Sequence, residues 1–235
     1  MATTGVRARA RAELTEQIKE VARRHLAEQG AAALSLRAVA RELGMVSSAV
    51  YRYFPSRDEL LTALIVDAFD AVGTAAEVAD AGCDRDDVLG RWLAVSHAVR
   101  RWAIANPHEY ALVYGSPVPG YAAPTDTIDP AARVSLVLLD LVAHGIETGA
   151  IATDDRITTT RDLRQDLAGL RSLAAPGVPD GVLSRALLVW TQLFGAISYE
   201  LFGHLHRVVT DYDALFDLQV RRTGALLVHG LREPG

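Results

Sequence analysis

The feature that most restricts the fold of this chain is a series of three short helical patterns near its N-terminus. Apolar residues recur at helical spacing over residues 14–26, and Gly30 ends that pattern. A second pattern over residues 36–43 ends at Gly44, because glycine enters a left-handed turn at little steric cost. A third and still shorter pattern follows over residues 49–54. A helix, a glycine turn and a short helix within about thirty residues form the pattern of a helix-turn-helix.

The last of these segments is short, and polar on one side, as a helix must be to enter the DNA major groove, which is about 12 Å wide. Its outward side chains are expected to be Ser47, Ser48, Tyr51 and Arg52. Hydroxyl and guanidinium groups donate hydrogen bonds to phosphates and base edges. The pattern alone leaves open a helical hairpin with a solvated face.

Basic residues are concentrated in the same region. Residues 1–57 contain ten Lys and Arg against five Glu, whereas the rest contains 14 Lys and Arg against 24 Asp and Glu. The net charge of −5 therefore divides into a basic segment and an acidic remainder, as expected when one segment binds a polyanion. Because Lys19 is the only lysine, chance enrichment in arginine is the alternative interpretation.

The remainder of the chain predicts further helices and no strand. Half of all residues are hydrophobic but only 6% are aromatic, which favours helices over strands. A capping box at Ser56 and Glu59 begins a helix with apolar positions through Val72. Further helices are expected over residues 87–105, 129–149 and 162–173. A short helix is expected to begin at residue 106 and to end before a loop at 115–124. Two long helices are expected to begin at residues 180 and 210.

These patterns predict an all-α protein of about nine to ten helices, with a three-helix DNA-binding domain and a larger helical domain. The expected segments are a flexible basic arm at 1–10, a helix-turn-helix domain at 11–57, a connecting helix at 58–74, and a ligand-binding and dimerisation domain at 75–235.

The compartment is expected to be the cytoplasm. The single cysteine, Cys83, agrees with a reducing environment, and the basic N-terminus is followed by no apolar signal region. The most apolar stretch, residues 186–203, carries Gln192 and Glu200, so we expect a buried helix and no membrane association. No catalytic residue, metal site or cofactor is predicted.

Two runs of sequence resemble the signature of the tetracycline-repressor (TetR) family. They are Leu36-Arg37-Ala38-Val39-Ala40-Arg41-Glu42-Leu43-Gly44 and Ser48-Ala49-Val50-Tyr51-Arg52-Tyr53-Phe54-Pro55-Ser56-Arg57-Asp58-Glu59-Leu60-Leu61. The resemblance covers about 26 positions, and its Tyr-x-Tyr-Phe-x-Ser-Arg block is specific to that family. It implies a DNA-binding transcriptional regulator, most often a ligand-responsive repressor that binds a palindromic operator in double-stranded DNA as a homodimer.

The resemblance also implies roles for individual residues. Tyr51, Tyr53 and Arg57 would bind phosphates, Arg37 would lie at the DNA backbone, and Ser47, Ser48 and Arg52 would approach base edges or nearby phosphates. One position departs from the family pattern, because Val46 stands where a Ser or Thr usually caps the recognition helix. Either Ser47 caps the turn instead, or the helix begins with a different geometry.

The penultimate helix has apolar residues with 4-3 spacing, which is typical of a seam for another helix. In the TetR family the last two helices pair with their copies in a four-helix bundle, and a monomeric core is the alternative. The residues expected to form this homodimer interface are Leu183, Leu187, Phe194, Ile197, Leu201, Phe216, Val220 and Leu227. Gly195 and Gly203 favour a close approach of helices. Blocks around Trp190 and His204 also resemble a C-terminal subclass marked by Trp, His-Gly and Gly-His (WHG).

A regulator of this kind is expected to bind a small effector among its C-terminal helices. Few charges lie among the candidate residues, so we expect an apolar or weakly polar molecule. The candidate lining residues are Phe69, Trp92, His97, Trp102, Tyr110, Tyr114, Trp190, Tyr199 and Phe202.

Two alternatives compete with this interpretation. An enzyme is disfavoured, because Ser116 lacks a Gly-x-Ser-x-Gly elbow and no glycine-rich phosphate loop is present. Glu200 and His204 lie four residues apart on one helix, but zinc needs further ligands that this spacing does not supply. The second alternative is a helical small-molecule-binding or interaction module that never contacts DNA.

Overall fold

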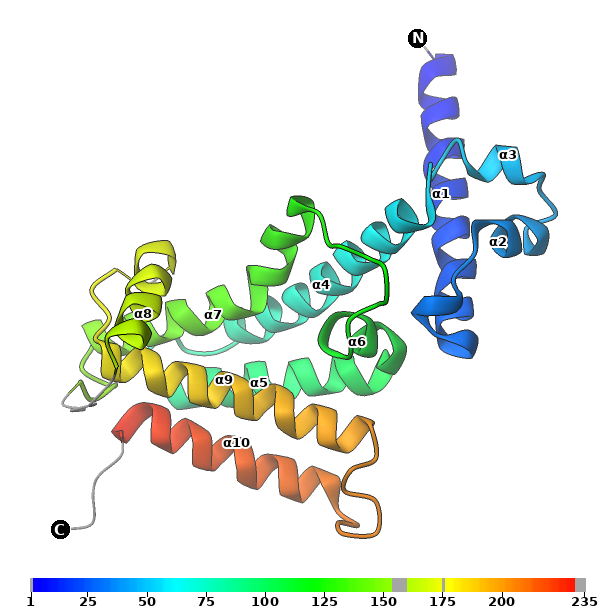
Figure 1. Ribbon diagram of the computed structural model, residues 1–235. Helices are drawn as coiled ribbons and strands as arrows, with labels where there is room; N and C mark the ends of the chain where they lie inside the picture. Colours follow the sequence, from blue (N-terminus) through cyan, green and yellow to red (C-terminus); the bar gives the residue numbers. More distant parts are fainter. Residues whose placement is uncertain (1, 154–159, 175, 231–235) are drawn as a thin grey trace. The chain divides into compact units, whose positions relative to one another are not determined.

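The computed structural model describes residues 2–153, 160–174 and 176–230, and within them every regular element is a helix (Figure 1). The all-α prediction is therefore confirmed. The α-helices are α1 (Ala2–Gln29), α2 (Leu36–Glu42), α3 (Ser47–Val50), α4 (Arg57–Ala81), α5 (Val88–Ala105), α6 (Pro107–Tyr114), α7 (Ile128–Glu147), α8 (Arg161–Ala174), α9 (Asp180–Leu201) and α10 (Tyr212–His229). Two short 3₁₀ helices, η1 (Ala31–Ala33) and η2 (Thr125–Thr127), complete the described elements.

The chain forms two compact units, and it passes from one to the other within α4, between α5 and α6, and within α7. Unit 1 contains Met1–Asp70 and Asn106–Pro130, and unit 2 contains Ala71–Ala105 and Ala131–Gly235. This differs from the expected segments, in which residues 106–130 belong to the C-terminal domain. The difference arises because α6 packs on α1, which no pattern local to either helix reveals.

Unit 1 has its own hydrophobic core, built from one apolar face of each of its first helices. Ile18 of α1, Val39 of α2, Val50 of α3 and Leu60 of α4 are all fully buried. Ser56 accepts a hydrogen bond from the backbone N–H of Glu59 at 3.1 Å, so the hydroxyl of the predicted capping box stabilises the start of α4. These contacts fix α3 against α2 with its polar side outward.

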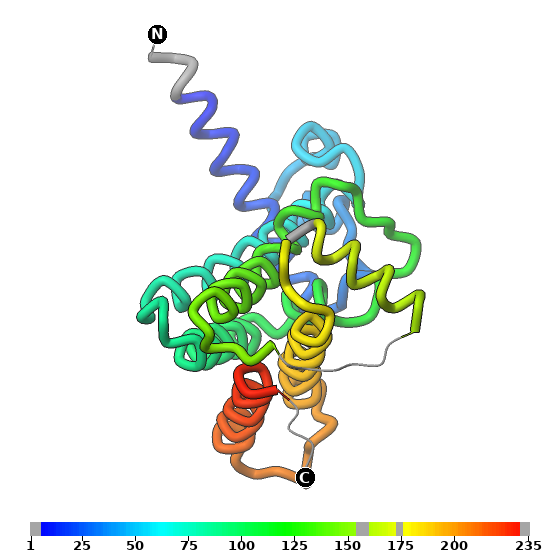
Figure 2. The backbone as a smooth tube through the Cα atoms, turned by 90° about the vertical axis from the view of Figure 1, so that its left-hand side faces the viewer, coloured from blue at the N-terminus to red at the C-terminus, as the bar shows by residue number. Residues whose placement is uncertain are grey.

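Unit 2 is a bundle in which α9 and α10 lie side by side and antiparallel, and both pack on α5 (Figures 1 and 2). Trp92 of α5 is buried, and its indole Nε1–H donates to the carbonyl oxygen of Val220 in α10 at 2.7 Å. The two helices approach closely at Gly224, where an added Cβ would lie 2.5 Å from Trp92 Cδ1. Glycine is therefore required for this contact between α5 and α10.

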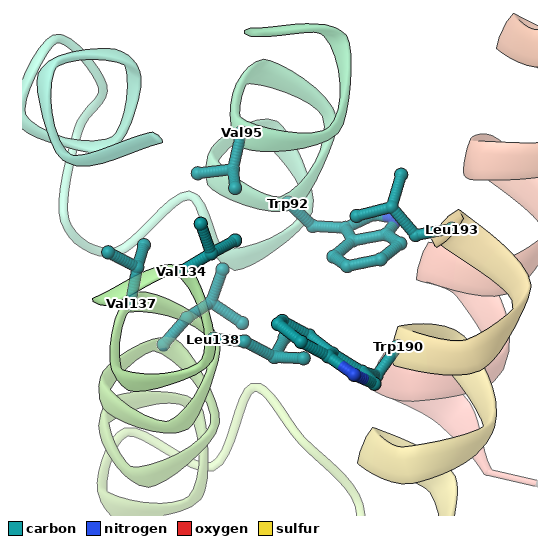
Figure 3. Close-up of a pocket in the computed structure, with 8 residues that line it drawn as sticks. Trp92, Val95, Val134, Val137, Leu138, Trp190 and Leu193 are labelled. Carbon is teal, nitrogen blue, oxygen red and sulfur yellow. The ribbon is translucent and has the colours of Figure 1, made fainter. Parts of the chain in front are cut away.

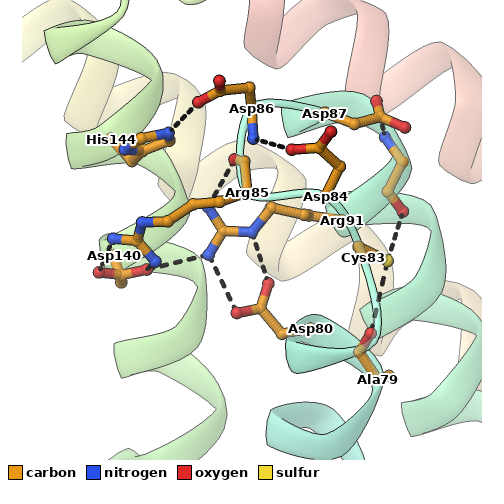
Figure 4. Close-up of polar contacts among 11 residues, drawn as sticks. Ala79, Asp80, Cys83, Asp84, Arg85, Asp86, Asp87, Arg91, Asp140 and His144 are labelled. Carbon is orange, nitrogen blue, oxygen red and sulfur yellow. Dashed lines mark hydrogen bonds and ion pairs between the residues drawn. The ribbon is translucent and has the colours of Figure 1, made fainter.

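A buried arginine joins α4, α5 and α7 within unit 2 (Figure 4). Arg91 is 1% exposed, and its guanidinium donates to Asp80 at 2.8 and 2.9 Å and to Asp140 at 2.9 Å. Asp140 also accepts two hydrogen bonds from Arg85, which chiefly lower the pKa of its carboxyl group. A buried charge of this kind is tolerated because every partner of the guanidinium is a carboxylate or carbonyl oxygen.

The ends of three elements differ from expectation. The arm expected at residues 1–10 lies in α1, which begins at Ala2, because alanine and arginine have high helix propensity. The connecting helix expected at 58–74 continues as α4 to Ala81, and in this added part Ala76 is buried and Glu77 pairs with Arg133. The last helix, expected from residue 210, begins at Tyr212 after its N-cap Asp211, whose carboxylate accepts from the backbone N–H of Ala214.

Within the described ranges, one helix has the length and apolar composition of a membrane span, namely α9. One such helix is weak evidence for a membrane span. Half of its apolar stretch is buried inside the protein, and a core helix passes the same test of length and composition.

Candidate functional site

The polar side of unit 1 is built around α3, which has only four residues. Its N-cap is Val46, with an extended backbone and no side-chain hydrogen bond to the helix. Ser47 is the first helical residue, so the alternative in which Ser47 caps α3 is wrong. Backbone hydrogen bonds continue the turn beyond α3, for example from Phe54 N–H to Val50 at 3.1 Å. We call residues 47–54 the recognition segment.

The recognition segment has one buried and one exposed side, as the sequence predicts. Val50 and Phe54 are buried in the core of unit 1. Ser48, Tyr51 and Arg52 are exposed, Tyr51 to 42%, while Ser47 and Tyr53 are half-buried. An exposed phenol and guanidinium on a short helical turn can donate to phosphates or base edges without moving the core.

A second group of basic side chains borders the recognition segment. Arg37 of α2 is exposed, and Arg57 at the start of α4 is half-buried. Together with Tyr51 they line an open hollow of about 310 Å³, which also contains residues 34–36. Arg57 donates to the carbonyl oxygen of Ala31 at 2.8 Å, so its guanidinium is held in place by η1. The hollow therefore combines two guanidinium groups and one phenol, which suits an anion such as phosphate.

The N-terminal part of α1 contacts the end of the recognition segment. Arg11 donates to the carbonyl oxygen of Arg52 at 3.3 Å, and its guanidinium lies 5.1 Å from the ring centroid of Tyr53. These contacts were not predicted, because Arg11 and Tyr53 are 42 positions apart and spacing within one helix does not relate them.

A cluster of ion pairs holds α1 to two other helices of unit 1. Arg23 donates to Asp67 of α4 at 2.6 Å and lies 3.1 Å from Glu109 of α6, while Lys19 lies 2.8 Å from Asp67. Burial raises the pKa of Glu109, although Arg23 acts in the opposite direction. We call Lys19, Arg23, Asp67 and Glu109 the α1 ion-pair cluster.

Unit 2 contains a small apolar cavity between α5, α7 and α9 (Figure 3). Its volume is about 10 Å³, which is room for about one water molecule. Trp92 and Trp190 lie on opposite sides of it, and both are among the predicted effector residues. The other lining residues are Val95, Val134, Val137, Leu138, Leu141 and Leu193. The prediction missed them because it considered aromatic side chains, although the apolar periodicity of residues 128–147 marks the face of α7.

The remaining predicted effector residues lie elsewhere. Phe69, Tyr110 and Tyr114 belong to unit 1, where Tyr114 packs edge-on against Phe69 and burial raises its pKa. His97 lies 3.3 Å from Asp217, and Trp102 is half-buried on α5. Tyr199 and Phe202, at the C-terminal end of α9, are 56% and 44% exposed. None of these seven side chains lines the cavity of unit 2.

The predicted dimerisation residues divide into two groups. Buried within the protomer are Leu183, Ile197, Phe216, Val220 and Leu227. Phe194 and Leu201 are half-buried, and Leu187 is exposed. The predicted seam therefore belongs mainly to the protomer's own core, in which α9 packs on α5 and α10.

A different face of α9 is exposed. It carries the exposed Leu188 and Tyr199, the half-buried Gly195 and, at the C-cap, the exposed Phe202. These positions are spaced by seven, four and three residues, so they share one side of the helix. An added Cβ at Gly195 would meet no atom within 4 Å. We call these four residues the exposed face of α9.

Glu200, one of the two residues considered for a metal site, forms an ion pair with an arginine. Arg100 donates to its two carboxylate oxygens at 2.8 Å each, and to Asp213 at 2.7 Å. This bidentate pair joins α5 to the end of α9 and explains Glu200 without a metal.

Both parts of the chain resemble known families. Residues 18–64 match the family described as bacterial regulatory proteins, tetR family, and residues 92–223 match the one described as Tetracyclin repressor-like, C-terminal domain. The chain is 45% identical over 230 residues to the HTH-type transcriptional regulator Rv1816 of Mycobacterium tuberculosis, covering 95% of this chain and 96% of that protein. The HTH-type transcriptional regulator Mb1846 of Mycobacterium bovis matches equally.

Solved structures agree with these matches. The regulatory protein SCO4313 is 35% identical with a TM-score of 0.76, covering 92% of this chain and 97% of that one. A bacterial regulatory protein in the tetR family from Rhodococcus RHA1 is 16% identical with a TM-score of 0.63, covering 93% and 98%, and shows the same fold.

Proposed function

The chain belongs to the TetR family of helix-turn-helix transcriptional regulators, and we propose that it binds a palindromic operator as a homodimer that a small apolar effector releases. The single observation that carries the DNA-binding part is the recognition segment. Its exposed Ser48, Tyr51 and Arg52 stand on a short turn whose other side is buried in the core of unit 1.

DNA binding follows from this geometry. The recognition segment enters the major groove, where Ser47, Ser48 and Arg52 reach base edges or the nearest phosphates. Tyr51, Tyr53, Arg37 and Arg57 bind the backbone on either side, and a phosphate oxygen fits the hollow between the two guanidinium groups. Arg57 is positioned by its hydrogen bond to Ala31, so little side-chain entropy is lost on binding.

Homodimerisation through the exposed face of α9 completes the DNA-binding form. Leu188, Tyr199 and Phe202 leave apolar surface in contact with solvent, and open space at Gly195 allows the backbone of a second α9 to approach closely. Two recognition segments must then lie about 34–36 Å apart, or a low multiple of that distance, to read successive major grooves.

The effector binds at the cavity between Trp92 and Trp190. Every lining side chain is apolar, so an uncharged molecule rich in aliphatic or aromatic groups fits best. Ligand sites usually enclose about 300–1,000 Å³, and the cavity is far smaller, so binding must separate α5, α7 and α9. Such a displacement favours a second spacing of the recognition segments and weakens operator binding by about 1–3 kcal/mol.

We propose a regulatory and not an enzymatic role in the cytoplasm, and repression in preference to activation because family members mostly repress. The resemblance to the WHG subclass remains a prediction, since the matched C-terminal family carries a broader description.

An electrophoretic mobility shift of genomic fragments tests the DNA-binding part. The wild-type chain is expected to retard a subset of fragments, and Tyr51→Ala or Arg52→Ala to abolish the shift. Arg164→Ala on α8 removes an exposed arginine from unit 2 and serves as the matched control. Equal shifts by Tyr51→Ala and wild type would contradict the assignment of the recognition segment.

A further inference from the structure

The first turns of α1 extend beyond the helix-turn-helix core and carry three arginines, Arg7, Arg9 and Arg11. All three are exposed. Among the residues that the structure describes, no carboxylate pairs with Arg7 or Arg9. Three exposed cations at alternate positions repel one another, so their local arrangement favours a polyanionic partner.

Arg11 fixes which side of this extension lies at the recognition segment. Its guanidinium donates to the carbonyl oxygen of Arg52 and stacks over the ring of Tyr53, at 3.3 Å and 5.1 Å. The face of α1 that carries Arg11 therefore borders the C-terminal end of the segment that we propose to contact DNA.

Helical periodicity distinguishes the two remaining arginines. Arg7 is four residues before Arg11, so it projects from the same face about 6 Å further along the helix axis. Arg9 is two residues from each of them, about 200° around the axis, and projects from the opposite side. Of the two, only Arg7 lies on the face of α1 that carries Arg11 and therefore borders Arg52 and Tyr53.

We propose that Arg7 binds a DNA phosphate beyond those reached by Tyr51 and Tyr53, so that the first turns of α1 lengthen the operator contact. This inference rests on the proposed function. It assigns to Arg7 a backbone contact that adds affinity without base specificity, and to Arg11 the role of positioning the extension. Tyr53 then contacts both the guanidinium of Arg11, through its ring, and the DNA phosphate that we propose it binds.

Salt dependence of DNA binding measures this contact directly, because each phosphate contact adds about 0.9 to the slope of log affinity against log salt concentration. The probe is a random-sequence duplex of about 40 base pairs, since phosphate contacts do not depend on sequence. Arg7→Ala is expected to lower the slope by about 0.9 per bound protomer, or about threefold in affinity over a fourfold change in salt.

Three further variants make the test selective. Arg9→Ala removes the same charge from the opposite face and is expected to retain most of the wild-type slope. Arg7→Lys keeps the charge and is expected to restore the slope, while Arg11→Ala is expected to resemble Arg7→Ala because the extension loses its anchor. Alanine has high helix propensity, so these exposed substitutions leave α1 helical.

The outcomes separate this inference from the proposed function. Equal slopes for wild type, Arg7→Ala and Arg9→Ala, with normal DNA binding, would overturn the role of Arg7 and leave the recognition segment intact. An equal loss in Arg7→Ala and Arg9→Ala would also overturn it, since the effect would then be one of net charge. Absence of DNA binding by the wild-type chain would overturn both proposals.

Discussion

The guanidinium of Arg23 in α1 lies 3.1 Å from the carboxylate of Glu109 in α6. This pair joins the first helix of the chain to a helix more than eighty residues later, and it is one of the contacts that hold α6 in unit 1. Because Arg23 also binds Asp67 of α4 at 2.6 Å, one side chain holds three helices of unit 1 together.

Replacement of Arg23 by alanine is expected to destabilise the protein. The substitution leaves Asp67 and Glu109 partly buried without this cation, so we expect the free energy of unfolding to fall by about 1–2 kcal/mol. Urea unfolding followed by circular dichroism measures the change. Arg24→Ala removes a neighbouring, more exposed arginine and is expected to change stability little. Equal effects of the two substitutions would contradict the importance of the α1 ion-pair cluster.

Glu109 gives this cluster a pH dependence. Burial raises the pKa of Glu109 above the ordinary value of 4.5, so the folded protein binds a proton more tightly at this site than the unfolded chain. Stability is then lost as the pH rises from 4.5 through the folded pKa. We expect the unfolding free energy of wild type to decline relative to Glu109→Gln over that interval. Parallel curves for wild type and Glu109→Gln would exclude this effect.

The approximate positions of the helices were predictable from the sequence, because apolar residues recur at helical spacing and turn or capping residues separate most of the patterns. Which side of α9 packs in the core and which side is exposed was not predictable from the sequence. That helix is apolar around most of its surface, so the 4-3 pattern of Leu183 and Ile197 indicates a partner helix without showing that the partner is α10 of the same chain. The exposed face of α9 became recognisable only once its packing was known.

The exposed side of the recognition segment was predictable for a different reason. Val50 and Phe54 are apolar and Tyr51 and Arg52 are polar at adjacent positions of one short turn, so burial of one pair exposes the other. The contact of Arg11 with Tyr53 and that of Arg23 with Glu109 depend on how separate helices pack. Local periodicity carries no information about such pairs.

A charge on the exposed face of α9 is expected to separate the homodimer. Tyr199→Glu places a carboxylate at a side chain that is 56% exposed in the protomer, where a partner would bury it. Sedimentation equilibrium is expected to give twice the chain mass of 25.3 kDa for wild type and about one chain mass for the variant. Leu163→Glu on α8, also at an exposed leucine, is the control. A variant that remains dimeric would place the interface elsewhere.

Alanine at two glycines is expected to change stability in opposite directions, because only Gly224 lies at the close contact between α5 and α10. In Gly224→Ala the new Cβ would lie 2.5 Å from Trp92 Cδ1 and 2.6 Å from Leu89 Cδ1. Trp92 is held by its hydrogen bond to Val220, so we expect a loss of about 1–3 kcal/mol in unfolding free energy. Gly169→Ala on α8 meets no atom within 4 Å and is expected to gain about 0.5–1 kcal/mol. Thermal unfolding of both variants measures the difference, and a neutral Gly224→Ala would show that α5 and α10 adapt easily.

The central claim, that the recognition segment reads DNA sequence, is tested most directly by selection of binding sites from a random duplex pool at low salt. We predict that the wild-type chain enriches a palindrome whose half-sites lie about one helical turn, or a low multiple of it, apart. Arg52→Ala, measured on that palindrome, is expected to lose affinity and discrimination between bases. Recovery of no enriched sequence, or of the same sequence with equal affinity by Arg52→Ala, would contradict the claim.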